Sequence, residues 1–202
     1  MQQTNKDFID NMLRSALNVY HYGSYVYGTY IPGVSDIDFI VIVPNECKYE
    51  EQVEFDNCQY SIYTESEWQT MLDNNEVDAI ETYFIPDEYK AKETKVFTTT
   101  IIKEKIRNNF SHVASNSFVK CKKKLVIENS FNPRVGKKSL WHSLRIIDFG
   151  IQILEHGKIV DYSSMNHLHD EIVNCTSDDW QHYKEKYQSV YNSLKSKFRA
   201  CS

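Results

Sequence analysis

The sequence predicts an α/β (α+β) protein, in which a domain of strands and helices is followed by a helical region. Three observations support this prediction. The run from Ile37 to Val43 is apolar and mostly β-branched beyond its aspartate, as expected of a central strand that is covered on both faces. Residues 51–55 and 59–63 flank Asp56-Asn57, a pair typical of a hairpin turn. From about residue 98 onward, apolar residues recur at helical spacing.

The first half of the chain alternates between helical and strand patterns. A helix is expected first, from six apolar positions at helical spacing: Phe8, Ile9, Met12, Leu13, Ala16 and Leu17. Val19-Tyr20 then leads into a turn at Gly23-Ser24, ahead of the central strand. After the hairpin, Thr64 begins a second helix, and a short helix over residues 76–84 ends before Pro86. This order argues for an α/β domain.

The second half is expected to contain only helices. A long helix should run from about residue 102 to residue 121, followed by a loop over residues 129–136. A second helix is expected over residues 139–155, with Gly157 as its C-cap. An aromatic stripe over residues 180–198 indicates the last helix. We therefore divide the chain into an α/β domain, residues 1–97, and a helical domain, residues 98–202.

The composition indicates an intracellular globular protein. Of the 202 residues, 41% are hydrophobic and 25% are charged, as in ordinary globular domains. No apolar run reaches the ~20 residues of a membrane span, and the N-terminus lacks the apolar core of a signal peptide. The five cysteines are scattered and form no CxxC motif, so we expect free thiols and a cytoplasmic location, with no membrane partner.

The charge is divided unevenly along the chain. Residues 1–100 carry 6 basic and 18 acidic side chains, whereas residues 101–202 carry 17 and 10. An acidic half that holds a metal together with a basic half that faces phosphates is one explanation. Ordinary variation in surface charge is the other.

Two carboxylates at the start of the central strand form the strongest candidate site. Asp36 and Asp38 are two residues apart, so in a strand both point to the same face. Two such close like charges are tolerated when a divalent cation lies between them, and oxygen ligands suit Mg²⁺ (or Mn²⁺). Gly23-Ser24, about a dozen residues earlier, can bring a backbone close to phosphates and add a hydroxyl donor. The plainer alternative is a turn followed by a strand with N-terminal acids.

This combination resembles the nucleotidyltransferase signature of the DNA polymerase β superfamily. The residues that carry the resemblance are Gly23-Ser24, followed after eleven residues by Asp36-Ile37-Asp38 and the apolar strand. Gly23–Gly28 and Ser35–Asp38 look like one branch, the predicted nucleotidyltransferases associated with RNA repair in bacteria and large phages. The likeness extends over three further segments: residues 62–68, 76–84 and 139–145.

The resemblance implies a small mixed sheet with flanking helices, followed by a C-terminal helical lobe. It also implies transfer of a nucleoside monophosphate from an NTP, with Mg²⁺ and release of pyrophosphate. Asp36 and Asp38 match the catalytic metal ligands of the family, and Gly23 and Ser24 match its phosphate-contacting turn. The nucleotide partner is thus an NTP, and the acceptor is open between RNA, protein and a small molecule. The nucleotide-binding residues expected on this basis are Gly23, Ser24, Tyr27, Gly28, Ser35, Lys138, His142 and Arg145.

One position departs from the family pattern. The family usually has a third carboxylate on the next core strand, and the alignment places Gln59 there. Glutamine cannot accept a proton usefully and is a weak metal ligand. Glu54 or Asp56 could supply the missing charge if the register is shifted, or both could be solvated hairpin acids. The alternative to an active enzyme is therefore a degenerate member that binds a nucleotide, RNA or a protein without catalysis.

A second candidate site lies in the helix over residues 139–155 and just before it. Lys138, His142 and Arg145 have spacings of four and three, which places them on one helix face. Lysine and arginine suit the β- and γ-phosphates, and His142 could bind phosphate or ribose. A solvated face, or a histidine hydrogen-bonded within the fold, is the alternative. A basic run is either a solvated helix end or an RNA backbone contact; its members are Lys120, Lys122, Lys123, Lys124 and, further on, Lys137.

Overall fold

The computed structural model describes residues 2–47 and 49–201. The chain divides into two compact units, Met1–Thr100 and Ile101–Ser202. The first unit contains all the strands that the structure describes, and the second is helical. In the described part of the chain, no helix is both long and apolar enough to cross a bilayer.

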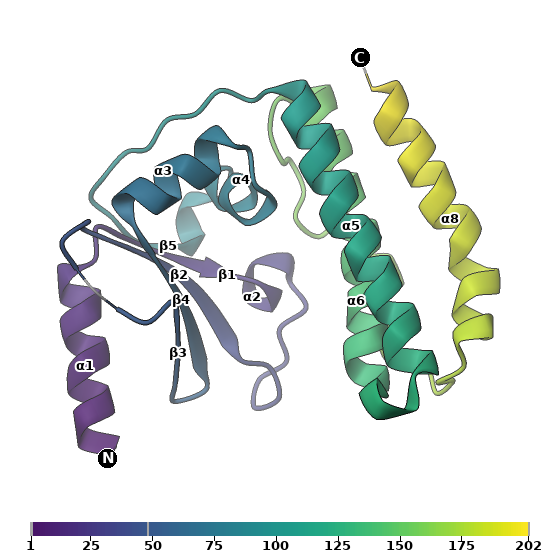
Figure 1. The fold of residues 1–202 in the computed structure, drawn as a ribbon, viewed down its shortest axis with the longest axis horizontal. Coiled ribbons are helices and arrows are strands. Elements are labelled where there is room, and N and C mark those ends of the chain that lie inside the picture. The colour runs from purple at the N-terminus through teal and green to yellow at the C-terminus, as the bar shows by residue number, and fades with distance from the viewer. Residues whose placement is uncertain (1, 48, 202) are drawn as a thin grey trace. The chain divides into compact units, whose positions relative to one another are not determined.

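A five-stranded mixed sheet forms the middle of the first unit, in the order β3-β4-β2-β1-β5 (Figure 1). β2 and β4 are parallel, and the other neighbouring strands are antiparallel. Residues 40–43 of β2 are buried, which confirms the predicted central strand. The strands are β1 (Asn18–Tyr22), β2 (Ile37–Val43), β3 (Gln52–Phe55), β4 (Cys58–Thr64) and β5 (Lys90–Glu93).

Helices cover both faces of this sheet. On one face, α1 (Gln2–Ser15) packs Ile9 and Met12 into a core with alternate residues of the strands, among them Ile62 of β4. The next residue, Tyr63, points to the opposite face, where its ring lies 5.4 Å from that of Trp68. Trp68 belongs to α3 (Glu65–Asp73), and α4 (Val77–Tyr83) follows it along the chain.

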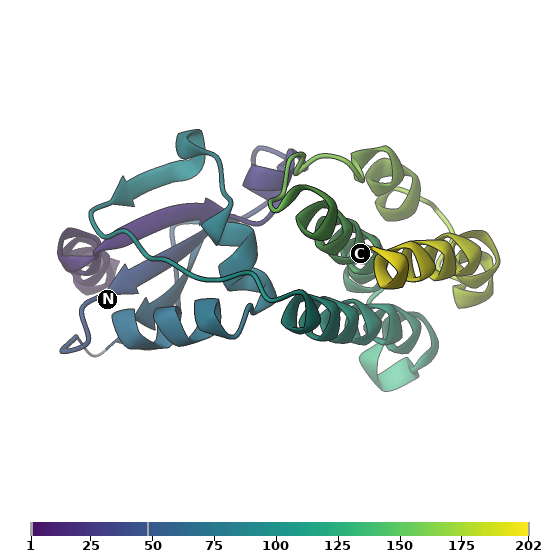
Figure 2. The same ribbon diagram turned by 90° about the horizontal axis from the view of Figure 1, so that it is seen from above.

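The second unit is built around α6 (Pro133–His156), a helix with most of its residues buried. α5 (Lys103–Val126) and α8 (Trp180–Ala200) lie alongside it (Figure 2). A Cβ atom at Gly150 would lie 2.7 Å from the Phe198 ring, so glycine allows α6 and α8 to approach closely. α7 (Asn166–Val173) lies between α6 and α8 in the sequence and packs against α6.

The structure corrects three details of the expected elements. α6 begins at Pro133, so the second half of the loop expected over residues 129–136 is helical. The reason is a strong N-terminal signal: Asn132 accepts a hydrogen bond from the Val135 amide at 3.2 Å, and proline occupies the first helical position. The sequence also did not lead us to expect α7 or the edge strand β5, which are only eight and four residues long.

Candidate active site

The turn after β1 is built around Gly23, whose backbone has φ 64° and ψ −142°. Residues with a side chain rarely adopt this conformation. A Cβ atom at this position would also lie 2.1 Å from Oδ2 of Asp38. Glycine is therefore required here for two reasons, and the second shows that the turn lies directly against a predicted metal ligand.

One turn of helix, α2 (Ser24–Tyr27), follows Gly23 immediately. The Tyr27 amide donates a hydrogen bond to the Gly23 carbonyl at 3.1 Å. Gly28 ends the turn in the left-handed conformation, with φ 73°. Two glycines thus bound a compact segment that begins with Ser24, the predicted hydroxyl donor.

Ser35 anchors the loop that leads into β2. It is 8% exposed, its hydroxyl accepts the Ile31 amide at 3.1 Å, and its carbonyl accepts the Asn57 side-chain amide at 3.0 Å. Asp36 follows just before β2 and is exposed, whereas Asp38 lies in β2 and is half-buried. The buried serine therefore fixes the approach to an aspartate pair that stays accessible to solvent.

Asp38 belongs to a row of paired residues that crosses four strands. It pairs with Tyr22 on β1 and with Gln59 on β4, and Gln59 pairs with Glu54 on β3. Paired residues in neighbouring strands project from the same face. Gln59 thus lies beside Asp38, where the resemblance leads us to expect a carboxylate. Glu54 is two strand spacings from Asp38, about 10 Å.

The alternative acids do not complete a three-carboxylate cluster. Asp56 lies in the turn between β3 and β4, with φ 50°. In residues 2–47 and 49–201, no group of three or more His, Cys, Asp or Glu side chains is placed to hold a metal ion. The register of β3 and β4 is the one that the sequence indicated, and it leaves Gln59 in the third position.

The residues present still fit a divalent cation. Asp36 and Asp38 supply hard oxygen ligands, and Gly23 leaves space at the Asp38 carboxylate that any side chain would fill. Mg²⁺ is commonly held by one or two carboxylates, with the remaining positions taken by water and substrate phosphates. Two aspartates beside this glycine turn therefore suit this ion.

Sequence reasoning missed Glu81, a carboxylate that packs beside this turn. Glu81 lies on α4 and is 1% exposed. Its Oε2 accepts a hydrogen bond from the Tyr27 hydroxyl at 2.6 Å and lies 3.0 Å from the Tyr22 hydroxyl. The sequence carried no signal for it, because only the structure shows that α4 buries five of its seven residues. An acid in so buried a helix needs polar partners, and the two tyrosines provide them.

The three predicted nucleotide-binding residues of the second unit do not share one exposed face of α6. Lys138 is exposed and His142 is half-buried, whereas Arg145 is 0% exposed. The Arg145 guanidinium lies 4.7 Å from the centroid of the Phe149 ring and 5.6 Å from that of Trp141. Arginine stacks on aromatic rings in this way, which explains why spacing alone misplaced it on the solvated stripe.

Burial and the contact with Arg145 together favour the neutral form of His142. Its Nη2 donates to His142 Nδ1 at 2.9 Å. Burial, followed by the charges of Arg145 and Lys120, lowers the pKa of His142 from 6.5 to about 3. His142 is therefore neutral at physiological pH, and its proton lies on Nε2 because Nδ1 accepts.

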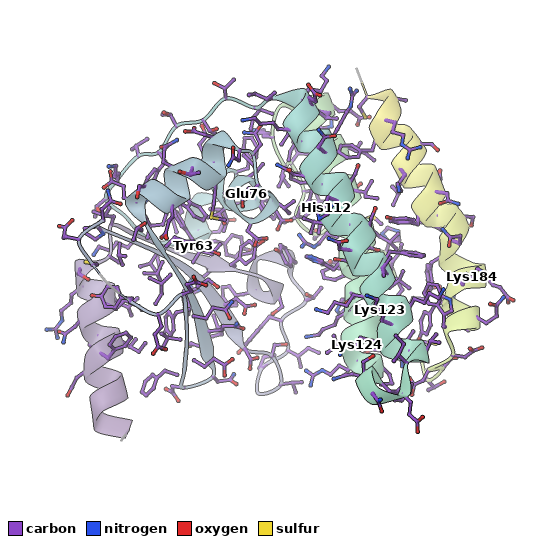
Figure 3. The ribbon with its side chains drawn as sticks, viewed as in Figure 1. Tyr63, Glu76, His112, Lys123, Lys124 and Lys184 are labelled. Carbon is purple, nitrogen blue, oxygen red and sulfur yellow. The ribbon has the colours of Figure 1, made fainter. Side chains whose placement is uncertain are left out.

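The basic run lies at the C-terminal end of α5. Lys123 and Lys124 occupy its last turn (Figure 3), where positive charge complements the helix dipole. Lys122 and Lys123 are exposed. Lys137 has a different environment: it is buried, with its Nζ 2.7 Å from the Cys175 carbonyl and 2.7 Å from Asp178 Oδ1. Lys137 therefore holds the loop before α8 in place.

Comparison with known proteins agrees with the geometry of the first unit. Residues 6–125 match the model of the nucleotidyltransferase domain family. The match contains all five strands, the glycine turn and both aspartates. No curated protein matches the sequence. Because the match spans more than half of the chain and includes the candidate site, the chain belongs to the nucleotidyltransferase domain family.

Proposed function

We propose that this protein transfers a nucleoside monophosphate from an NTP to an acceptor, with Mg²⁺ or Mn²⁺, and releases pyrophosphate. The family supports nucleotidyl transfer in general. The observation that carries the proposal for this chain is the close approach of Gly23 to the Asp38 carboxylate. One small region thereby combines a backbone turn suited to phosphates with an accessible pair of metal-binding carboxylates.

In this mechanism, the chain contributes mainly binding and orientation. Gly23 lets the backbone approach the phosphates, and Ser24 donates its hydroxyl to them. Asp36 and Asp38 hold the cation, which when bound offsets negative charge on the phosphates. Ser35 fixes the loop before Asp36, and Tyr27 and Gly28 keep the turn compact. The α-phosphate is thereby oriented for attack by the acceptor.

The α6 residues are assigned to the nucleotide in the same proposal. Lys138 is exposed, and in this proposal its ammonium group would bind a phosphate as a point charge. Burial and the charge of Arg145 keep His142 neutral, so that Nε2–H would donate to a phosphate or ribose oxygen. Arg145 would then act on the nucleotide through His142, while Lys138 would bind directly.

RNA is the acceptor that we favour. The sequence resembles the branch associated with RNA repair in bacteria and large phages, and the exposed lysines near the end of α5 suit an RNA backbone. A protein hydroxyl is the other acceptor in the test. The same resemblance suggests a bacterial cytoplasm, or a host cytoplasm for a phage protein. The five cysteines are free thiols, in keeping with a reducing compartment.

The second candidate function is a degenerate member that binds a nucleotide, RNA or protein without turnover. Gln59 beside Asp38 favours it, because an amide can neither serve as a general base nor ligate Mg²⁺ well. This alternative predicts NTP binding by calorimetry with no labelled product at any Mg²⁺ or Mn²⁺ concentration. Turnover by the parent protein would exclude it.

The deciding experiment uses α-labelled NTPs with an RNA oligonucleotide and, separately, a hydroxyl-bearing protein as acceptors. Asp36→Asn and Asp38→Asn should each abolish labelling while the thermal unfolding temperature stays close to that of the parent. Asp56→Asn is the matched control: asparagine tolerates the left-handed backbone there, so this variant should label normally. Equal labelling by the Asp36→Asn/Asp38→Asn double variant and the parent would refute the site.

A further inference from the structure

One buried carboxylate contacts both ends of the glycine turn. Tyr22 is the last residue of β1 and directly precedes Gly23, and Tyr27 is the last residue of α2. Their hydroxyls lie 3.0 Å and 2.6 Å from the same oxygen, Oε2 of Glu81. The Tyr22 and Tyr27 rings also meet edge to face, with centroids 6.0 Å apart. A single atom on α4 therefore links the residues that bracket the turn.

The same contacts connect α4 to the metal ligands. Tyr22 pairs with Asp38 across β1 and β2, so displacement of Tyr22 would act directly on the strand that carries the carboxylate. The Tyr22 hydroxyl is also 2.9 Å from Oδ1 of Asp78, one turn before Glu81 on α4. Two carboxylates of one short helix thus contact the tyrosine beside Asp38.

The turn needs such support because of its own backbone. Gly23 and Gly28 bound it, both with positive φ, and glycine restricts the chain less than any other residue. α2 between them is only four residues long, too short to be stable by itself. Hydrogen bonds to a buried carboxylate are stronger than those between neutral groups, so they can hold a segment that its own sequence leaves loose.

We propose that Glu81 is a positioning residue of the nucleotidyl-transfer site, which holds the Gly23–Gly28 turn through the hydroxyls of Tyr22 and Tyr27. The claim that Glu81 influences NTP binding rests on the proposed function. The claim that Glu81 holds the turn rests on the geometry alone. Glu81 is not assigned as a metal ligand, because its side chain is 1% exposed and its Oε2 already contacts both tyrosine hydroxyls.

The chain contains a matched control for this contact. Tyr20 lies on β1, the strand that also carries Tyr22. It is as buried as Tyr27, and both side chains are 5% exposed. Its hydroxyl donates to Oε1 of Glu93 on β5 at 2.9 Å. Tyr20→Phe and Tyr27→Phe each remove one hydroxyl that donates to a glutamate, but only the second removes a contact of the turn.

The first measurement is hydrogen–deuterium exchange of the amides that close the turn. These are the Val26 and Tyr27 amides, which donate to the Gly23 carbonyl, and the Thr29 amide, which donates to the Ser24 carbonyl. Tyr27→Phe should speed their exchange about tenfold, the effect of losing a charge-assisted hydrogen bond, and Tyr20→Phe should leave it unchanged. Equal exchange in Tyr27→Phe and the parent, or equal loosening by Tyr20→Phe, would overturn the proposal.

The second measurement is the affinity for ATP in the presence of Mg²⁺, by calorimetry. Tyr27→Phe should weaken binding about tenfold, and Tyr20→Phe should not. Glu81→Gln keeps an acceptor oxygen without the charge and should fall between the parent and Glu81→Ala. Unchanged ATP affinity in Tyr27→Phe would refute a role for the turn contact in binding. A parent protein that binds none of the four NTPs would refute the proposed function, while the exchange comparison would still decide whether Glu81 holds the turn.

Discussion

Two regions were expected to contact the nucleotide: the Gly23–Gly28 turn with Asp36 and Asp38, and the α6 residues Lys138, His142 and Arg145. The charged side chains of these two regions differ in their exposure to solvent. Asp36 remains exposed at the start of β2, and the Asp38 carboxylate adjoins a glycine that leaves it space. On α6, Arg145 is fully buried against aromatic rings and holds His142. The first region leaves its charges accessible to solvent, whereas the second buries its arginine against aromatic rings and a histidine.

The largest expected effect follows from the tight contact in the first region. Gly23→Ala places a methyl group on Asp38 and also strains a backbone with positive φ. We expect transfer to fall at least ~100-fold, because small displacements of catalytic groups have effects of this size. Gly33→Ala is the control: Gly33 has φ 75°, and no atom lies within 4 Å of its added Cβ. Equal losses of activity in the two variants would mean that backbone strain causes the effect, and that the contact between Gly23 and Asp38 is not specifically required.

Arg145→Lys tests whether the α6 charge is structural. Lysine keeps the charge but loses the planar group that stacks on Phe149 and donates to His142. We expect the free energy of unfolding to decrease by about 2–4 kcal/mol, as for other disrupted buried networks. Lys138→Ala, at an exposed position, should change it by less than about 0.5 kcal/mol. If Arg145→Lys unfolds like the parent in urea but loses ATP affinity, then Arg145 binds phosphate directly and the contrast between the two regions fails.

The pH dependence of stability tests the neutral state of His142. Its pKa is about 3 in the folded chain and 6.5 as an ordinary value. Between these values the unfolded chain binds a proton that the folded chain does not, so stability is complete above pH 6.5 and decreases as the pH falls toward 3. The contribution approaches about 1.4 kcal/mol per pH unit within that window.

His142→Asn provides the comparison for this slope. The asparagine oxygen can accept from Arg145 in place of Nδ1, but it does not titrate. Urea unfolding between pH 4 and pH 7 should therefore show a shallower loss of stability in His142→Asn than in the parent. Identical slopes would mean that His142 does not titrate differently in the two states, and that Arg145 leaves its protonation unaffected.

The two regions also differ in how much the sequence could predict. Strand periodicity requires only two positions to define a face, so spacing alone predicts that Asp36 and Asp38 share one, although Asp36 lies just before β2. The hairpin register placed Gln59 beside Asp38. Helical periodicity places Lys138 and Arg145 on the same side of α6. It does not show that aromatic rings surround the Arg145 guanidinium and bury it. Glu81 could not be located from the sequence, because its partners lie more than fifty residues away and meet it only after the sheet and α4 have packed.

The smallest effect that we predict concerns Gln59, which occupies the position where the family usually has a third carboxylate. Gln59→Glu places a third carboxylate next to Asp38, one strand spacing away. Without a cation, the added like charge should lower the unfolding temperature, and Mg²⁺ should restore it more than in the parent. Transfer should rise by up to about tenfold, less than a tuned general base provides, because the surrounding groups have not been arranged to set its pKa. Gln52→Glu, on the adjacent edge strand β3, is the control and should change neither quantity. No Mg²⁺-dependent stabilisation in Gln59→Glu would show that this position does not face the cation, and that the two aspartates act without a third partner on β4.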